Sequence, residues 1–392
     1  MIYRMVPRDQ IGRGMGIFGI ALLVAPAIGP TLGGYLVEYV DWRWIFTINL
    51  PIGVIGMILA FFFLPEFQSK HPGKLDIGGA VTSATALFCL LLALTKGADW
   101  GWLDERTLLL LCVSFFSFVL FIYLELTAAN PLLDLRVFRY PGFTLANLTI
   151  IVTMIGMFSG LFFLPLFLQS IRGIGAMETG LLMMPGALLS GLMMPVIGRL
   201  YDKIGARPLV IVGLLTMAFI TFLYRNLNLA TATGTVMLWT MFRGLVMPLA
   251  NMPAQTAAMA DIPTEMIGRA SAITNIIGRV ASSFGIAVLT SMLTKRQTLH
   301  AARLTWEVTP ANSTAMGFIQ HASSYMGGGG HGKTMALAYI WGIIQKTSFV
   351  TAIDEVFIVT AAFTLIALVP AFFLKRSKSA AAGQQRQAAM AE

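Results

Sequence analysis

Two arginines, Arg243 and Arg279, lie deep inside apolar stretches that are long enough to cross a bilayer. A charged side chain at this depth is costly and usually marks a functional site. One hypothesis is that both arginines line a water-filled cavity and bind an anionic group or a carboxylate. The alternative is structural, with the guanidinium groups bonded to backbone carbonyls that nearby prolines leave free. The residues alone leave both hypotheses open.

Polar and flexible side chains accompany the two arginines. Met247 and Asn251 follow Arg243 in a segment that two prolines bend, and Asn275 lies one turn before Arg279. The candidate cavity set is therefore Arg243, Met247, Asn251, Asn275 and Arg279. No carboxylate in the apolar stretches is an obvious partner for either arginine. Methionines such as Met247 can form a compliant pocket for varied apolar molecules, or they can simply pack helices.

A glycine-rich segment, Gly327–Thr334, satisfies the P-loop pattern formally. That pattern needs a preceding strand and a following helix, and here it follows a polar segment, so we expect a flexible glycine loop. No Ser/His/Asp, HExxH or paired CxxC arrangement occurs, and we expect neither enzyme activity nor a metal or cofactor site. All four histidines fall in segments expected to be loops: His71, His300, His321 and His331.

Composition places the chain in a membrane. Of the 392 residues, 57% are hydrophobic and 11% are charged, against about 25% charged residues in soluble domains. A water-soluble fold could not cover this much apolar side chain, so the lipid bilayer is the expected main partner. The net charge of +9 follows from the collection of Lys and Arg in cytoplasmic loops and does not indicate nucleic-acid binding.

Ten apolar stretches have the length of about 20 residues that a membrane helix needs. They are 14–37, 44–65, 76–96, 106–127, 144–169, 177–198, 207–225, 234–260, 266–294 and 352–374. Residues 295–351 are expected to form a long outside loop, and 375–392 a cytoplasmic tail. We therefore expect an all-α polytopic membrane protein of about ten transmembrane helices.

The charges of the short connections give the orientation. One side holds five basic residues: Arg43, Lys96, Arg106, Arg172 and Arg225. The other side, with both termini, holds fifteen: Arg4, Arg8, Arg13, Lys70, Lys74, Arg136, Arg139, Arg199, Lys203, Arg207, Arg269, Lys375, Arg376, Lys378 and Arg386. Both termini are therefore expected to be cytoplasmic.

A proline- and glycine-rich pattern in the first stretch could position another helix. Pro26 and Pro30 remove backbone bonds and bend a spanning helix, while Gly29, Gly33 and Gly34 leave a bare face for close packing. Ordinary small-residue packing would explain the same pattern.

A short basic loop between two stretches is a candidate gate. It contains Gly198, Arg199, Asp202, Gly205 and Arg207. A carboxylate such as that of Asp202 is stabilised at the positive end of a helix, and Gly205 permits a tight turn. A plain basic turn on the cytoplasmic side is the alternative.

These segments resemble a known family. The pattern of residues 29–34, followed by Trp-Arg-Trp-Ile-Phe at 42–46 and Asn-Leu-Pro-Ile-Gly at 49–53, resembles the antiporter motif of the major facilitator superfamily, in particular the fourteen-span drug:proton antiporters of the EmrB/QacA type. Residues 198–207 resemble the superfamily's Gly-x-Leu-x-Asp loop, with Ala206 where a basic residue is often found. Residues 125–138 and 269–279 match the family more loosely.

The resemblance implies an architecture that lacks the family's first four spans. Residues 1–65 would be the last two helices of the N-terminal half, 66–128 two inserted linker helices, and 129–374 the six-helix C-terminal half. The bent motif helix would seal the two halves, and the Asp202 loop would latch the inward gate.

The resemblance implies multidrug efflux across the cytoplasmic (inner) membrane by proton antiport with alternating access. The substrates would be small amphipathic drug-like molecules, and the proton gradient would supply the energy in place of a cofactor. A periplasmic adaptor protein and an outer-membrane channel are further candidate partners. The alternative is a non-transporting membrane remnant, the truncated gene product of such a transporter.

Overall fold

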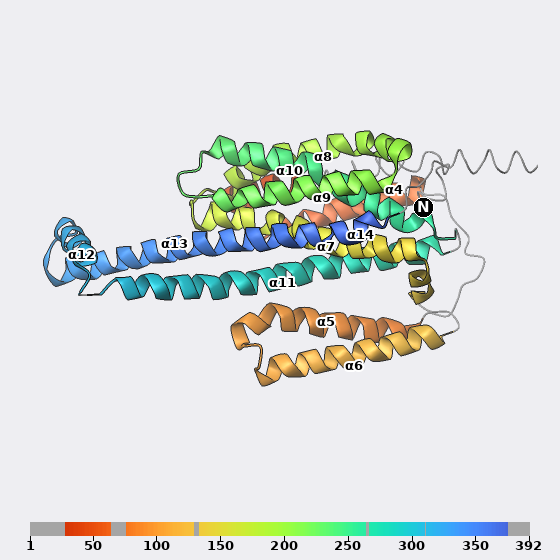
Figure 1. The fold of residues 1–392 in the computed structure, drawn as a ribbon, viewed down its shortest axis with the longest axis horizontal. Helices are drawn as coiled ribbons and strands as arrows, with labels where there is room; N and C mark the ends of the chain where they lie inside the picture. The colour runs from red at the N-terminus through yellow and green to blue at the C-terminus, as the bar shows by residue number, and fades with distance from the viewer. Residues whose placement is uncertain (1–27, 64–75, 129–132, 264–265, 310, 375–392) are drawn as a thin grey trace, which may run out of the picture.

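The computed structural model describes residues 28–63, 76–128, 133–263, 266–309 and 311–374. Every regular element in these residues is a helix, and the long helices run side by side (Figure 1). Eight helices in the described ranges are long and apolar enough to cross a membrane. The prediction of an all-helical, multi-pass membrane protein is confirmed.

The spans expected between 144 and 374 pack together as a bundle. Phe163, Phe167 and Phe357 are fully buried in one core cluster, and Phe143 and Leu214 in another. The helices of the bundle are α7 (Pro141–Ser170), α8 (Ala176–Ile204), α9 (Ala206–Leu223), α10 (Thr233–Ala260), α11 (Ile267–Glu307), α13 (Gly329–Ile366) and α14 (Leu368–Phe372). A 3-10 turn, η4 (Tyr224–Asn226), follows α9.

Helix α10 differs from its neighbours in polarity. It was expected to span at 234–260, but it is not among the eight apolar helices of the described residues. It is long enough, at 28 residues, but carries Arg243, Asn251 and Gln255 and has two prolines inside it. Since it contacts α7, α8 and α9, protein covers much of its surface and tolerates these polar groups.

The first described segment is a helix over 28–35 that continues as a π-helical turn, η2 (Leu36–Val40). After a short break come α3 (Trp44–Thr47) and α4 (Asn49–Phe63). Segment 28–40 contacts α8, whereas no residue of α4 is buried. Within the described chain, the motif helix is thus the part of this region that is attached to the bundle.

Helices α5 (Ile77–Trp100) and α6 (Glu105–Thr127) form a separate antiparallel pair, drawn in orange in Figure 1. Each begins at an aspartate cap: the Gly79 N–H donates to Asp76 Oδ1 (2.8 Å), and the Arg106 N–H to Asp104 Oδ1 (2.9 Å). The pair meets the bundle through α5 and α11. These helices match the stretches expected at 76–96 and 106–127.

The prediction of a loop at 295–351 is wrong, because most of these residues are helical. Helices α11 and α13 continue past the other spans, and α12 (Ser313–Tyr325) joins their ends (Figure 1). At 41 and 38 residues they are each roughly 60 Å long, about twice the hydrocarbon core of a bilayer. We call residues 295–351, without position 310, the projecting hairpin.

The hairpin corrects two further expectations. His300, His321 and His331 lie in helices rather than loops. The glycine-rich segment is a turn at Gly327 and Gly328, both with positive φ, from which α13 starts at once. A helix precedes it, so the strand that a P-loop requires is missing at this point.

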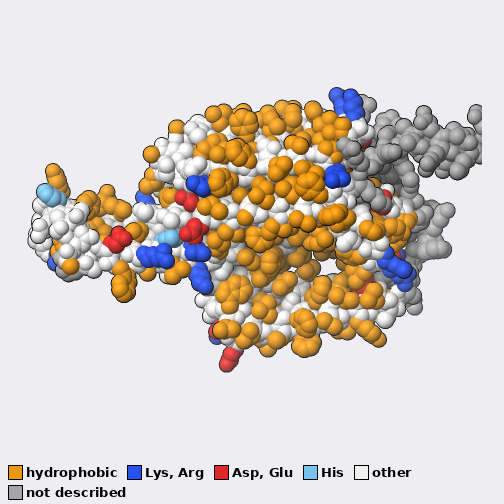
Figure 2. Space-filling model, in the orientation of Figure 1, with side chains coloured by type: hydrophobic (Ala, Val, Ile, Leu, Met, Phe, Trp, Pro, Cys, Tyr) orange, Lys and Arg blue, Asp and Glu red, His pale blue; other side chains and the backbone are white. Residues whose placement is uncertain are grey.

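An ionic cluster fixes the base of the hairpin. Glu355 of α13 pairs with Arg296 of α11 (3.1 Å) and with Nε2 of His300 (3.0 Å). Figure 2 shows hydrophobic side chains over most of the bundle and charged ones mainly near its ends and on the hairpin. This distribution suits a bundle that sits in lipid while the hairpin extends from one end of it.

Candidate functional site

Segment 28–40 and α8 touch through their backbones. A Cβ on Gly34 would lie 2.6 Å from the carbonyl carbon and oxygen of Ala176. A Cβ on Gly180 would lie 2.6 Å from the carbonyl oxygen of Pro30 and the Cα of Thr31. No side chain fits at either position unless the helices move apart, so one glycine from each helix makes this crossing possible.

Only some of the five residues of the proline–glycine motif take part in the contact with α8. Gly34 is packed against α8, and Pro30 supplies the backbone that covers Gly180. A Cβ on Gly29 or Gly33 would meet no described atom within 4 Å, and Pro26 lies outside the described residues. Within the described chain, close packing therefore depends on Gly34 rather than on the whole glycine face.

An apolar groove with a volume of about 310 Å³ opens beside the crossing. Its walls come from residues 30–45, α7 and α8, and the lining residues include no charged side chain. They are Pro30, Gly33, Gly34, Val37, Ile45, Leu161, Pro165, Gln169, Ala176, Thr179, Gly180 and Met183. A groove of this kind suits the apolar part of a small molecule, with a few polar groups for orientation.

Arg243 points into the middle of the bundle and is 8% exposed. Its Nη2 donates to the carbonyl oxygens of Gly156 (3.0 Å) and Met157 (2.8 Å), and its Nη1 donates to Thr221 Oγ1 (3.1 Å). One guanidinium thus joins α7, α9 and α10. A planar fork with several donors suits this task better than an ammonium group would.

The acceptors of Arg243 decide how it is held. Two of the three are backbone carbonyls, as the structural hypothesis expects, and the third is the Thr221 hydroxyl, but proline does not free the carbonyls. Pro165 of α7 removes the bond to the carbonyl of Leu161, which is not one of the acceptors. The guanidinium therefore bonds to two carbonyls of α7 whose own helical hydrogen bonds no proline removes.

Asn251 and Met247 lie near Arg243 on α10. Asn251 Nδ2 is 3.6 Å from Met157 Sδ and its Oδ1 accepts from Gln255 Nε2 (2.7 Å). Met247 is partly buried against the same core. Met157 is thus a common neighbour of Arg243 and Asn251.

The other two residues of the expected cavity lie elsewhere. Asn275 and Arg279 are exposed on α11, and Asn275 Nδ2 donates to the Ser271 carbonyl of its own helix (2.8 Å). The structure therefore brings together Arg243, Met247 and Asn251, and leaves Asn275 and Arg279 on a different surface.

The candidate gate loop lies at the end of the bundle opposite the hairpin. Gly205 joins α8 to α9 with φ of 81°, a conformation that favours glycine. Asp202 is in the last turn of α8, and Gly205, the N-cap residue of α9, has no side chain that could cap it. Gly198 is buried and Arg199 exposed, while the Arg207 guanidinium lies 5.8 Å from an aromatic ring centroid in α14.

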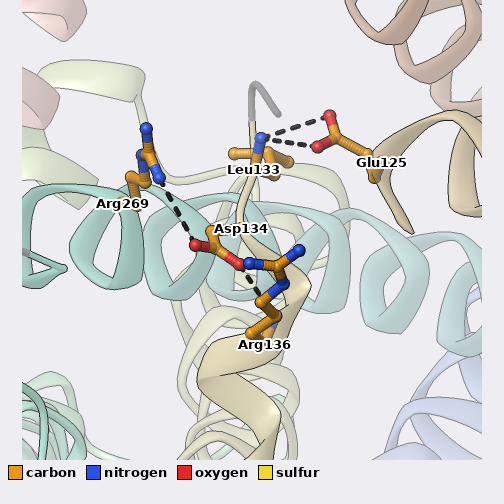
Figure 3. Close-up of polar contacts among 5 residues, drawn as sticks. All are labelled: Glu125, Leu133, Asp134, Arg136 and Arg269. Carbon is orange, nitrogen blue, oxygen red and sulfur yellow. Dashed lines mark hydrogen bonds and ion pairs between the residues drawn. The ribbon is translucent and has the colours of Figure 1, made fainter. Parts of the chain in front are cut away.

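Two buried acids tie the end of α6 to the bundle (Figure 3). Both carboxylate oxygens of Glu125 accept from the Leu133 N–H, at 3.1 Å each. Asp134 Oδ1 accepts from the Arg136 N–H (3.2 Å), at the start of η3 (Leu135–Arg139), and its Oδ2 pairs with Arg269 of α11 (3.3 Å). The segment after the helix pair is thereby fixed to the first turn of α11.

The arrangements described above are close helix contacts, an apolar groove and buried hydrogen bonds. In the part of the chain that the structure describes, no three His, Cys, Asp or Glu residues are placed to hold a metal ion. Residues 1–286 match the sequence pattern described as the Major Facilitator Superfamily. The chain belongs to this superfamily.

Three relatives of the chain have names that refer to transport, drug resistance or export. The chain is 33% identical over 379 residues to "Uncharacterized MFS-type transporter YhcA" of Bacillus subtilis, covering 95% of this chain and 71% of that protein. It is 30% identical to "Lincomycin resistance protein LmrB" of Listeria monocytogenes, covering 76% of this chain and 63% of that protein. It is 27% identical to "Multidrug export protein EmrB" of Haemophilus influenzae, covering 94% and 72%. The chain thus spans between three fifths and three quarters of these relatives' length.

Several residues make close contacts that were not predicted from the sequence. Gly160 lies under Arg243, and Gly186 and Gly244 meet where α8 crosses α10. Each is a glycine inside an apolar span, which is a usable signal for close helix packing. Glu38, which bonds to α8, has no such signal because it reads as an ordinary polar residue at the end of a span.

Proposed function

We propose that this chain belongs to a proton-coupled exporter of small amphipathic, drug-like molecules that works by alternating access. The observation that carries the proposal is the backbone contact between segment 28–40 and α8 at Gly34 and Gly180. In this proposal the two segments belong to different halves of the transporter, so their crossing closes the path on one side of the membrane.

The groove beside the crossing supports the class of substrate. Its lining is apolar, with Gln169 and Thr179 as polar groups, and it includes the adaptable side chain of Met183. A molecule with a large apolar body and few polar groups fits such a lining. The names of the LmrB and EmrB relatives, which refer to lincomycin resistance and multidrug export, point the same way.

The proposed orientation puts both termini in the cytoplasm and the projecting hairpin outside the inner membrane. It is supported by fifteen basic residues on one side of the short connections against five on the other. In an envelope with two membranes, the hairpin side would face a periplasmic adaptor protein and an outer-membrane channel.

The test is transport by the purified chain in proteoliposomes. We expect a pH gradient to drive the accumulation of a fluorescent amphipathic dye, and an uncoupler to abolish it. Gly34→Ala should reduce the initial rate at least tenfold, because its Cβ has no room against Ala176. Gly29→Ala is the matched control and should keep most of the rate, because a Cβ there meets no described atom within 4 Å and Gly29 does not line the groove.

Two outcomes would count against the proposal. Equal rates in the Gly34 and Gly29 variants would contradict the role of the crossing. If well-inserted protein moves no dye under any gradient, the chain is better described as a non-transporting membrane remnant.

A further inference from the structure

Glu38 makes a polar bond between segment 28–40 and α8. It lies in the middle of η2, and its Oε2 accepts from the backbone N–H of Met177 at 3.1 Å. A Cβ on Gly175 would lie 3.0 Å from Oε2 and 3.1 Å from Oε1, so the carboxylate covers the entry to α8 from the side.

The bond meets a need of α8 that its own sequence leaves open. The first N–H groups of a helix have no partner inside the helix, and a side chain at the N-cap usually accepts from one of them. Here the N-cap is Gly175, which has no side chain, and α8 has no cap bond of its own. A carboxylate from another segment therefore does what a cap residue would do, and its charge suits the positive end of the helix.

The bond and the glycine crossing act on the same pair of segments. Gly34 lies one turn before Glu38, and Gly180 lies one turn after Met177, so the polar contact is at the hairpin end of the apolar crossing. Glu38 is exposed in the described chain. A solvent-exposed bond of this type is weak enough to break and re-form, unlike the backbone contact beneath it.

We propose that Glu38 is a positioning residue that holds segment 28–40 against α8 at the hairpin end of the bundle. It would release α8 each time this end opens. The inference rests on the proposed function, since it requires an alternating-access cycle. It adds a polar latch to the glycine crossing, and the latch belongs to a residue outside the proline–glycine motif.

The test measures the gate without measuring transport. Thr179 is 2% exposed and lines the groove just inside the latch, so Thr179→Cys serves as a reporter once Cys89 and Cys112 are replaced by serine. We would measure its rate of reaction with a charged, membrane-impermeant thiol reagent, in proteoliposomes without substrate or gradient.

The latch predicts a graded response. Glu38→Ala should raise the reaction rate by about three- to tenfold, which corresponds to the loss of one charge-assisted bond at a helix end. Glu38→Gln should raise it less, because an amide oxygen still accepts the Met177 N–H. Glu178→Gln removes an exposed carboxylate from the same first turn of α8 and should leave the rate unchanged.

Two results would overturn the latch. One is a rate in Glu38→Ala within twofold of the parent, and the other is an equal increase in Glu178→Gln, which would indicate a general charge effect. If Glu38→Ala does not fold, Glu38→Asp replaces it, because it keeps the charge and draws the carboxylate back by one methylene. Labelling does not depend on transport. If dye uptake is absent while the labelling rates follow the prediction, the result contradicts the proposed function but not the latch.

Discussion

Gly160 of α7 lies directly against the guanidinium of Arg243 of α10. A Cβ at position 160 would lie 2.5 Å from Nη2 and 2.7 Å from Nη1, closer than any real contact allows. The absence of a side chain at this position makes room for a buried cation whose hydrogen bonds all go to neutral oxygens of α7 and α9.

This contact predicts that Gly160→Ala displaces Arg243. We expect a loss of about 1–3 kcal/mol in the free energy of unfolding, as for other overpacked interiors. Unfolding by denaturant in detergent micelles would measure it. Gly191→Ala in α8 is the control, because a Cβ there meets no described atom within 4 Å. The prediction fails if both alanines have the same effect.

The two arginines of the apolar stretches, Arg243 and Arg279, should respond differently to substitution by lysine. Arg243→Lys replaces the two Nη atoms, which bond to α9 and α7 respectively, by a single nitrogen, so we expect a loss of about 1.5–3 kcal/mol of stability. Arg279→Lys, at an exposed position, should stay within about 0.5 kcal/mol of the parent. Thermal unfolding of both variants in the same detergent distinguishes the two sites, and similar losses would argue that Arg279 is held as firmly as Arg243.

Among the glycine contacts of the described residues, the crossing of α8 and α10 should be the least tolerant of an added side chain. A Cβ on Gly244 would overlap the carbonyl oxygen of Gly186, and backbone cannot move aside as a side chain can. We therefore expect Gly244→Ala to cost about 3 kcal/mol or more and to lower the yield of folded protein. Gly234→Ala, near the start of the same helix and free of described neighbours, is the control. Size-exclusion profiles and melting temperatures would measure the difference, and normal values for Gly244→Ala would refute the crossing.

The ion pair between Asp134 and Arg269 should show measurable coupling. The Asp134 side chain is 9% exposed. In the Lys96–Asp99 pair, by contrast, the side chains are 46% and 68% exposed, respectively. A double-mutant cycle should give a coupling of about 0.5–1 kcal/mol for the first pair and about zero for the second. Hydrogen exchange of η3 should rise in Asp134→Asn, because the cap of Arg136 and the ion pair are both weakened. Equal coupling in the two pairs would contradict the anchoring role.

The sequence is a good guide to the spans, because the length of an apolar stretch decides whether it can cross the bilayer, and the helix propensity of its residues adds little. It is also a fair guide to Gly34 and Gly205, where only glycine has the size or the φ value required. It fails for the hairpin, because a polar helix that extends α11 has the composition of a loop. It also cannot tell that Arg243 is buried and Arg279 exposed, since the two differ only in which helix face meets a neighbour.

The length of α11 and α13 has a mechanical consequence. Both helices are continuous from the bundle into the projecting hairpin, and Glu355 fastens them together where they leave it. A rigid rod that is roughly 60 Å long and pivots near its middle moves its tip by about 5 Å for a tilt of about 10°. In the proposed alternating-access cycle, the hairpin would therefore act as a lever arm that converts a small rotation of the bundle into a displacement of several ångströms at its tip.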